Sequence, residues 1–208
     1  MSPKILCTGF KPFGPVAVNP TEQLMLALSA ERFPQAEVCA IVLDTDYARC
    51  EAQFDQALQS FGPDAVICFG VNRRADELRL ERIAVNVDDA AIGDTGGQLR
   101  QGQRIAPDGP VGYWSSLPLE EMHQALQEAG LPVAFSNHAG AYVCNHVFYY
   151  GRHLIETRGW SIPMGFIHVP PLPEELGEKD EGRSGMDPGT LLRAAQICIQ
   201  VLAKALQP

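Results

Sequence analysis

The sequence lacks long hydrophobic stretches, long blocks of charge of one sign, internal repeats and low-complexity tracts. The apolar run near the N-terminus is too short for the core of a signal peptide, and no later stretch is long enough to span a bilayer. We therefore expect a soluble, cytoplasmic protein. The formal net charge is -9. Because such a chain repels polyanions, we expect no nucleic-acid partner and no anionic membrane partner.

The sequence also has no C-x-x-C pair, which argues against a structural zinc site. Without an export signal, the even number of cysteines does not predict disulfides, because the cytosol keeps thiols reduced. Five cysteines are interpreted as core residues: Cys7, Cys39, Cys50, Cys68 and Cys198. The sixth, Cys144, has unusual surroundings.

Short apolar runs alternate with longer helical patterns along the 208 residues, of which 46% are hydrophobic. The predicted strands are Lys4–Thr8, Val38–Leu43, Ala65–Phe69, Leu80–Val87, Pro132–Ser136 and Pro163–Val169. The predicted helices are 20–29, Tyr47–Phe61, Pro118–Ala129, Asn145–Thr157 and Leu191–Leu206, and Asn-Pro and Asp-Pro pairs are expected to cap the first and last of them. This alternation predicts an α/β protein with a mostly parallel sheet covered on both faces, and the length fits one domain over residues 1–208.

A long glycine-rich segment, 92–113, is predicted to be a loop or an irregular hairpin. Three acidic residues lie in or beside it, Asp88, Asp89 and Asp94. Their spacing fits no calcium-binding loop, so we expect hydrated loop side chains and no metal site.

Cys144 follows a predicted strand and a run of small residues, at about the point where a helical pattern begins. A thiol at a helix N-terminus is close to the positive end of the helix dipole and to unpaired N–H groups, and both favour the reactive thiolate. The same N–H groups can hold the oxyanion of an acyl-transfer intermediate. The alternative is a buried cysteine in a tight turn.

A thiolate nucleophile needs a histidine as proton shuttle, and His168 is the best-placed candidate. It lies at the carboxyl end of an apolar strand, where the active sites of α/β sheets gather. The alternative is a core histidine bonded to a backbone carbonyl. A third group should orient the imidazole, and Glu81 interrupts a strand-like run. The alternative for Glu81 is a position facing solvent.

Taken together, four ordered motifs resemble the pyroglutamyl peptidase I family of cysteine peptidases over nearly the whole chain. The motifs are Thr8–Gly14 with Asn19-Pro20, Glu81–Asn86, Gly140–His146 and Gly165–Pro170. The resemblance implies a three-layer α/β/α sandwich with a mostly parallel mixed sheet, no metal or organic cofactor, and commonly a homotetramer. It also implies removal of an N-terminal pyroglutamate from peptides.

By motif match, the resemblance assigns a catalytic triad of Glu81, Cys144 and His168. The positions assigned to substrate binding are Phe10, Phe13, Asn19, Val71, Tyr142 and Val143. The alternative for Phe10 and Phe13 is that they pack in the core under a loop. Two alternatives to the family's function remain open: another thiol amidohydrolase acting on small lactams or amides, and a binding homologue that has lost turnover.

Three departures from the family pattern stand out. Family members often carry a Gly-Arg pair where this chain has 71–75, Val-Asn-Arg-Arg-Ala. Many have an arginine at the position of Ala91, and the usual phenylalanine at position 142 is a tyrosine, which is expected to add a hydroxyl to the pocket. All three leave the triad intact and alter its surroundings.

Overall fold

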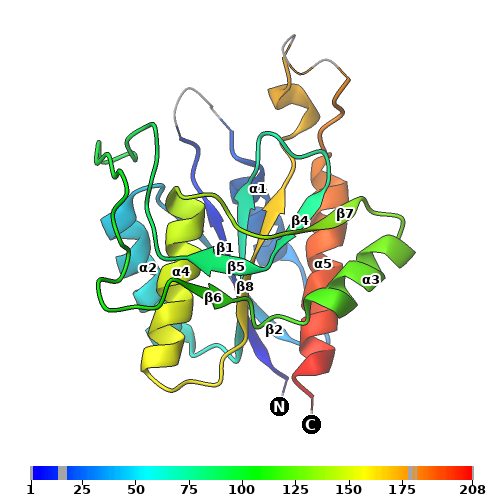
Figure 1. Ribbon diagram of the computed structural model, residues 1–208. Coiled ribbons are helices and arrows are strands. Elements are labelled where there is room, and N and C mark those ends of the chain that lie inside the picture. The colour runs from blue at the N-terminus through cyan, green and yellow to red at the C-terminus, as the bar shows by residue number, and fades with distance from the viewer. Residues whose placement is uncertain (1, 14–17, 178–179, 181, 208) are drawn as a thin grey trace.

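A six-stranded sheet forms the centre of the computed structural model, which describes residues 2–13, 18–177, 180 and 182–207 (Figure 1). The strand order is β2-β1-β3-β8-β4-β7. The strands are β1 (Lys4–Phe10), β2 (Glu37–Leu43), β3 (Ala65–Val71), β4 (Leu78–Glu81), β7 (Val133–Ser136) and β8 (Met164–Val169). The first four in the spatial order are parallel, and β4 runs antiparallel to β8 but parallel to β7. The predicted mixed, mostly parallel sheet is confirmed.

Helices cover both faces of this sheet and give the predicted α/β fold (Figure 1). They are α1 (Pro20–Ala30), α2 (Tyr47–Phe61), α3 (Leu119–Glu128), α4 (Val143–Thr157) and α5 (Pro188–Ala205), with a short 3-10 turn at Pro173–Glu175. Helices α1, α3 and α5 pack on one face, where Met25, Leu126 and Ile199 belong to one buried cluster. Helices α2 and α4 pack on the other, where Phe54 and Phe148 share a second cluster.

Side-chain caps fix the start of two helices as the sequence predicts. Asn19 Oδ1 accepts a hydrogen bond of 3.0 Å from the Thr21 amide at the start of α1. Asp187 Oδ1 accepts one of 3.0 Å from the Thr190 amide at the start of α5. Each bond satisfies an N–H group that the first turn of a helix leaves without an intrahelical partner.

The prediction of one strand over Leu80–Val87 is wrong, because the chain changes sheets at Arg82. Strand β4 ends at Glu81, whereas β5 (Ile83–Val85) pairs with β6 (Gly112–Trp114) in a separate two-stranded sheet. The backbone of Arg82 is shared, since its N–H donates to Ser136 in β7 and its carbonyl accepts from the Ser115 amide. Alternation alone cannot reveal such a change of partner.

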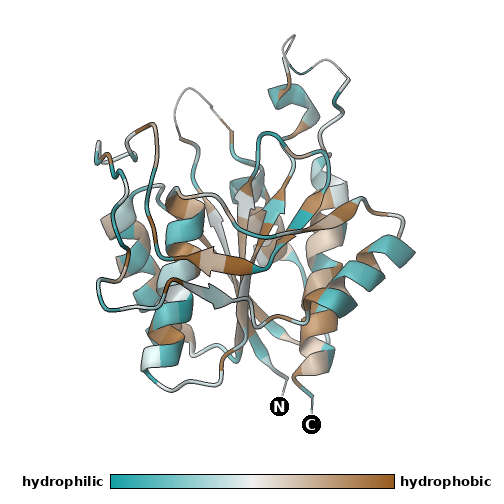
Figure 2. Ribbon diagram, viewed as in Figure 1, coloured by the Kyte–Doolittle hydropathy of each residue, from teal (hydrophilic) through white to brown (hydrophobic). Residues whose placement is uncertain are grey.

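Helices α3 and α4 carry both polar and apolar residues (Figure 2), and apolar residues such as Met122, Leu126 and Val147 are the buried ones. This is the expected pattern for helices that cover a sheet in water. Among the helices that the structure describes, none combines the length and the apolar character needed to traverse a bilayer.

Candidate active site

Glu81 and His168 form a buried pair across two neighbouring antiparallel strands. Glu81 Oε1 lies 2.7 Å from His168 Nδ1. Glu81 on β4 is in register with Phe166 on β8, two residues before His168, so the two side chains project from the same face of the sheet. The exposed fractions are only 1% for Glu81 and 5% for His168. The carboxylate therefore fixes the orientation of the imidazole and leaves Nε2 for another partner.

Cys144 is the second residue of α4, on the same face of the sheet as His168. The segment 137–142 leads to it from β7, and Gly140 takes a left-handed conformation with φ of 79°. Tyr142 is the N-cap residue, but its side chain makes no capping hydrogen bond. The Tyr142 side chain therefore does not satisfy the first-turn N–H groups around Cys144.

Gly70 makes room for the thiol, and sequence analysis missed it. It lies on β3, in register with His168 on the neighbouring strand β8. A Cβ at this position would lie 2.8 Å from Cys144 Sγ and 2.7 Å from Phe166 Cζ. Both separations are shorter than van der Waals contact, so a larger residue would displace the thiol. The only signal in the sequence was a glycine near the end of an apolar strand.

Two neighbouring groups, Cys144 and Glu81, raise the pKa of His168. Burial lowers the pKa, but hydrogen bonds to Cys144 and Glu81 outweigh burial and raise it from 6.5 to about 9. Both partners favour the imidazolium because each can carry a negative charge. Glu81 is hydrogen-bonded to His168, and Cys144 is the second group that favours the charged imidazolium.

A small pocket adjoins the thiol, with an empty volume of about 240 Å³. Its lining residues are Phe10, Phe13, Asn19, Thr45, Val71, Tyr142, Val143 and Cys144. The structure thus brings all six residues predicted to bind substrate into one wall around Cys144. Thr45 was missed, since it follows β2 without a motif. The pocket offers mainly apolar surface beside the thiol.

The polar side chains of this pocket are mostly occupied by the protein itself. Asn19 caps α1 through Oδ1, and its Nδ2 donates to the Lys11 carbonyl over 3.1 Å. The Tyr142 hydroxyl donates to the Gly93 carbonyl over 3.0 Å, and its ring lies 5.8 Å from that of Phe13 between centroids. The hydroxyl that position 142 adds is therefore used to hold the loop, and the aromatic faces remain for a ligand.

A second, larger cleft opens on the other side of Cys144. Its empty volume is about 1520 Å³. Its wall includes Cys144 and His168, together with residues of the segments 71–74 and 135–142. His168 lines this cleft but not the small pocket. The thiol therefore sits at the junction of an apolar pocket and an open groove, with the imidazole on the side of the groove.

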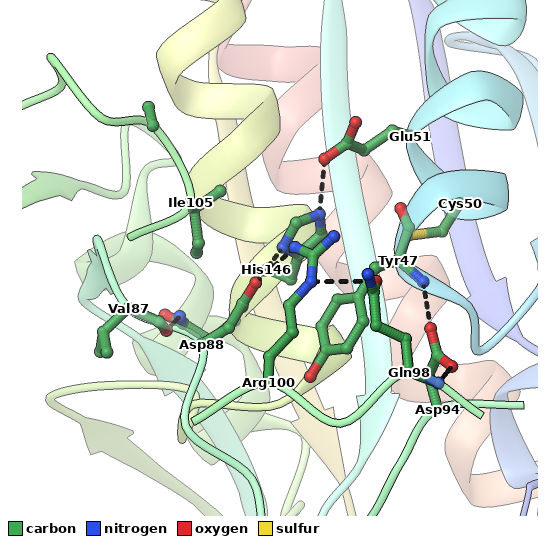
Figure 3. A network of polar contacts seen from close by, with 12 residues as sticks. Tyr47, Cys50, Glu51, Val87, Asp88, Asp94, Gln98, Arg100, Ile105 and His146 are labelled. Atoms are coloured by element: carbon green, nitrogen blue, oxygen red, sulfur yellow. Dashed lines mark hydrogen bonds and ion pairs between the residues drawn. The ribbon is translucent and has the colours of Figure 1, made fainter. Parts of the chain in front are cut away.

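A largely buried charged network surrounds His146, which lies two residues beyond Cys144 in α4 (Figure 3). His146 lies between two carboxylates, with Nδ1 and Nε2 each 2.8 Å from Asp88 and Glu51 respectively. Burial lowers the pKa of His146, but these two carboxylates raise it overall. Asp88 also accepts from Arg100 over 2.8 Å, and the Arg100 guanidinium lies 4.1 Å from the centre of the Tyr47 ring. The network ties the 86–100 segment to α2 and to the helix that carries Cys144.

The prediction of hydrated loop acids is therefore wrong for two of the three aspartates. Asp88 is fully buried in the network, and Asp94 is 8% exposed. Asp94 accepts from the Tyr47 and Gln98 amides over 3.0 and 2.7 Å (Figure 3). Asp89 is exposed, as predicted. The two buried carboxylates shape the loop beside the small pocket, and two of their partners, Tyr47 and His146, lie too far along the chain for local sequence to reveal.

The similarity to known proteins extends over nearly the whole chain. The sequence profile of the family described as pyroglutamyl peptidase matches residues 3–205. The pyrrolidone-carboxylate peptidase of Bacillus licheniformis is 39% identical over 203 residues, which cover 98% of this chain and 94% of that protein. The corresponding enzyme of Pyrococcus furiosus is 35% identical, with 98% and 99% covered.

Solved structures agree with the sequence matches. The pyrrolidone carboxyl peptidase from Thermococcus litoralis superposes with a TM-score of 0.94 at 31% identity, covering 98% of this chain and 94% of that one. The pyroglutamyl peptidase I of Bacillus amyloliquefaciens gives a TM-score of 0.92 at 31% identity, with 98% of each chain covered. With a matched profile, identities above 30% and the same fold throughout, this chain belongs to the pyroglutamyl peptidase family.

Proposed function

We propose that this protein is a cysteine peptidase that removes an N-terminal pyroglutamyl residue from peptides, with Cys144 as nucleophile, His168 as general base and acid, and Glu81 as the group that orients His168. The observation that carries the proposal is the position of Cys144, beside the buried Glu81–His168 pair and at the mouth of a small apolar pocket. Membership of the family supports the same activity.

In the proposed mechanism, His168 takes the proton of Cys144 and the thiolate attacks the pyroglutamyl carbonyl carbon. Backbone N–H groups at the start of α4, that of Cys144 among them, stabilise the oxyanion. His168 then donates its proton to the leaving amine, and the C–N bond breaks to give a thioester. Finally, His168 removes a proton from water, which hydrolyses the thioester and releases pyroglutamate and the free thiol.

The small pocket suits the chemistry of the leading residue of such a substrate. Pyroglutamate is a neutral lactam with a flat five-membered ring, one N–H donor and one ring carbonyl. It has no charged amine, so the site needs no carboxylate to anchor one. Phe10, Phe13 and Tyr142 offer aromatic faces, Val71 and Val143 complete the apolar wall, and backbone groups can serve the two polar atoms. Asn19 supports the loop that carries Phe13.

The wider properties of the protein are proposed on the resemblance to the family. We propose that residues 1–208 act as one catalytic domain, in the cytoplasm and as a homotetramer, without a metal or an organic cofactor. Size-exclusion chromatography with light scattering tests the assembly directly. A mass near four times the chain mass of 22.7 kDa is expected, and a monomer would contradict it.

A panel of reporter amides tests the activity and its rivals. The pyroglutamyl amide should be cleaved, and the unblocked prolyl and alanyl amides should be cleaved far more slowly. Equal rates on all three would indicate a different thiol amidohydrolase. Binding of a pyroglutamyl ligand without any cleavage would indicate a binding protein that has lost turnover.

A further inference from the structure

The large cleft beside Cys144 carries a charge opposite to that of the protein as a whole. The formal net charge is -9. Yet the described residues that line this cleft include Arg73, Arg74 and Arg79, and no aspartate or glutamate. His168 adds a fourth cationic group when protonated. A concentration of positive charge in a cleft of an acidic protein draws anionic groups to that site.

Of the three arginines, Arg79 is the one that the strand pairing places beside His168. It is in register with His168 across the antiparallel pair of β4 and β8, so both side chains leave the same face of the sheet. Residues paired in this way have Cβ atoms about 5 Å apart. Because His168 must deliver its proton to the leaving amine, the leaving peptide has to lie against His168 and therefore beside Arg79.

The hydrogen-bonding state of Arg79 is incomplete. Its Nε is buried and has no hydrogen-bond partner among the described residues. Its nearest carboxylate, Glu77, is 3.6 Å away from a terminal guanidinium nitrogen, and both side chains are more than a third exposed. Buried donors are normally satisfied. The side chain is nevertheless 37% exposed and lines the open cleft, and a guanidinium exposed in this way is suited to a planar carboxylate.

The neighbouring arginines sit on a segment whose shape is fixed by the protein. Arg183 donates to the carbonyls of Arg73 and Ala75 over 2.7 and 2.8 Å. Asn72 Oδ1 accepts from the Arg74 amide over 3.0 Å. Arg73 forms an ion pair with Glu175 at 3.1 Å, and this pair neutralises part of its charge. This leaves Arg79, supported by the field of Arg74, as the main contact for a ligand.

We infer that this cleft selects leaving peptides that carry a carboxylate close behind the scissile bond, and that Arg79 is the residue that determines this preference. The carboxylate has two possible sources: an acidic side chain directly after pyroglutamate, or the C-terminus of a very short peptide. The inference rests on the proposed function. It also assigns a supporting electrostatic role to Arg74, in the segment at which this chain departs from the family pattern.

Two pairs of substrates test the inference, and each pair consists of one acidic peptide and its neutral counterpart. The first pair is pyroglutamyl-glutamate amide and pyroglutamyl-glutamine amide, and the second is pyroglutamyl-alanine as free acid and as amide. For wild type we expect kcat/KM to be roughly tenfold higher for the acidic member of at least one pair. The pair that shows the preference identifies the source of the carboxylate, and added salt should reduce the ratio.

Three variants assign the preference to Arg79. In Arg79→Gln the ratio should fall to near one, whereas Arg79→Lys, which keeps the charge, should retain part of it. Arg32→Gln changes the net charge equally at an exposed site outside the cleft, and should keep the wild-type ratio. Thermal melting confirms that each variant folds.

Two results would overturn the inference alone: ratios near one for both pairs in wild type, or a full preference in Arg79→Gln. A wild-type enzyme that cleaves none of the four substrates would overturn the proposed function, and the inference with it. Cleavage of all four at equal rates would leave the proposed function standing.

Discussion

The Cys144→Ala substitution should lower the pKa of His168, because it removes one of the two partners that favour the imidazolium. Burial lowers this pKa, while Cys144 and Glu81 raise it, with a net change from 6.5 to about 9. A change of this size corresponds to about 3 kcal/mol of preference for the charged form. With Glu81 and the burial unchanged, we expect the pKa of His168 to fall in the variant.

A titration of isotope-labelled histidines by NMR measures this change, with the His168 signal assigned by its loss in His168→Gln. Wild-type His168 should remain charged well above neutrality, and in Cys144→Ala it should lose its proton at lower pH. The same raised pKa has a kinetic consequence: kcat/KM should decline as the pH rises through about 9, when His168 loses the proton that the leaving amine requires. An identical pKa in wild type and variant would refute a coupled thiol–imidazole pair.

Two further substitutions, each with a matched control, test the surroundings of the thiol. Gly70→Ala should reduce kcat by roughly 100-fold or more through displacement of Cys144 Sγ, which a Cβ would approach to 2.8 Å. At Gly177 no atom of the described residues lies within 4 Å of an added Cβ, so Gly177→Ala should be neutral, and equal activity of both variants would be evidence against the steric argument. Asn19→Ala and Asp187→Ala should each cost about 1 kcal/mol of stability in thermal melts, because each removes a helix cap. Only Asn19→Ala should also raise KM, since only that cap supports the pocket loop; a matching rise in Asp187→Ala would argue for a global effect.

Much of the fold could be predicted because its signals are local. The helix at Tyr47–Phe61 has the predicted bounds, and the Asn19 cap lies where a polar residue before a proline indicates it. The candidate site was also accessible, since His168 ends a strand and Cys144 begins a helix. Both positions follow from the rule that functional groups gather at the ends of elements in α/β proteins.

The features that could not be predicted depend on contacts between distant segments. The chain leaves the central sheet at Arg82 because the next strand pairs with β6, about 30 residues further along, and nothing in the alternating pattern marks this change. Asp88 is buried because His146 and Arg100 neutralise it from other elements. The role of Gly70 follows from the approach of α4 to β3, which only the packed structure reveals.

The most direct test of the central claim is the hydrolysis of a pyroglutamyl reporter amide by wild type and by Cys144→Ala under identical conditions. If Cys144 forms the thioester, the variant should lose at least about 1,000-fold in kcat while it still binds a pyroglutamyl ligand, because the apolar pocket is retained. Undiminished hydrolysis by Cys144→Ala would contradict the assignment of Cys144 as the nucleophile.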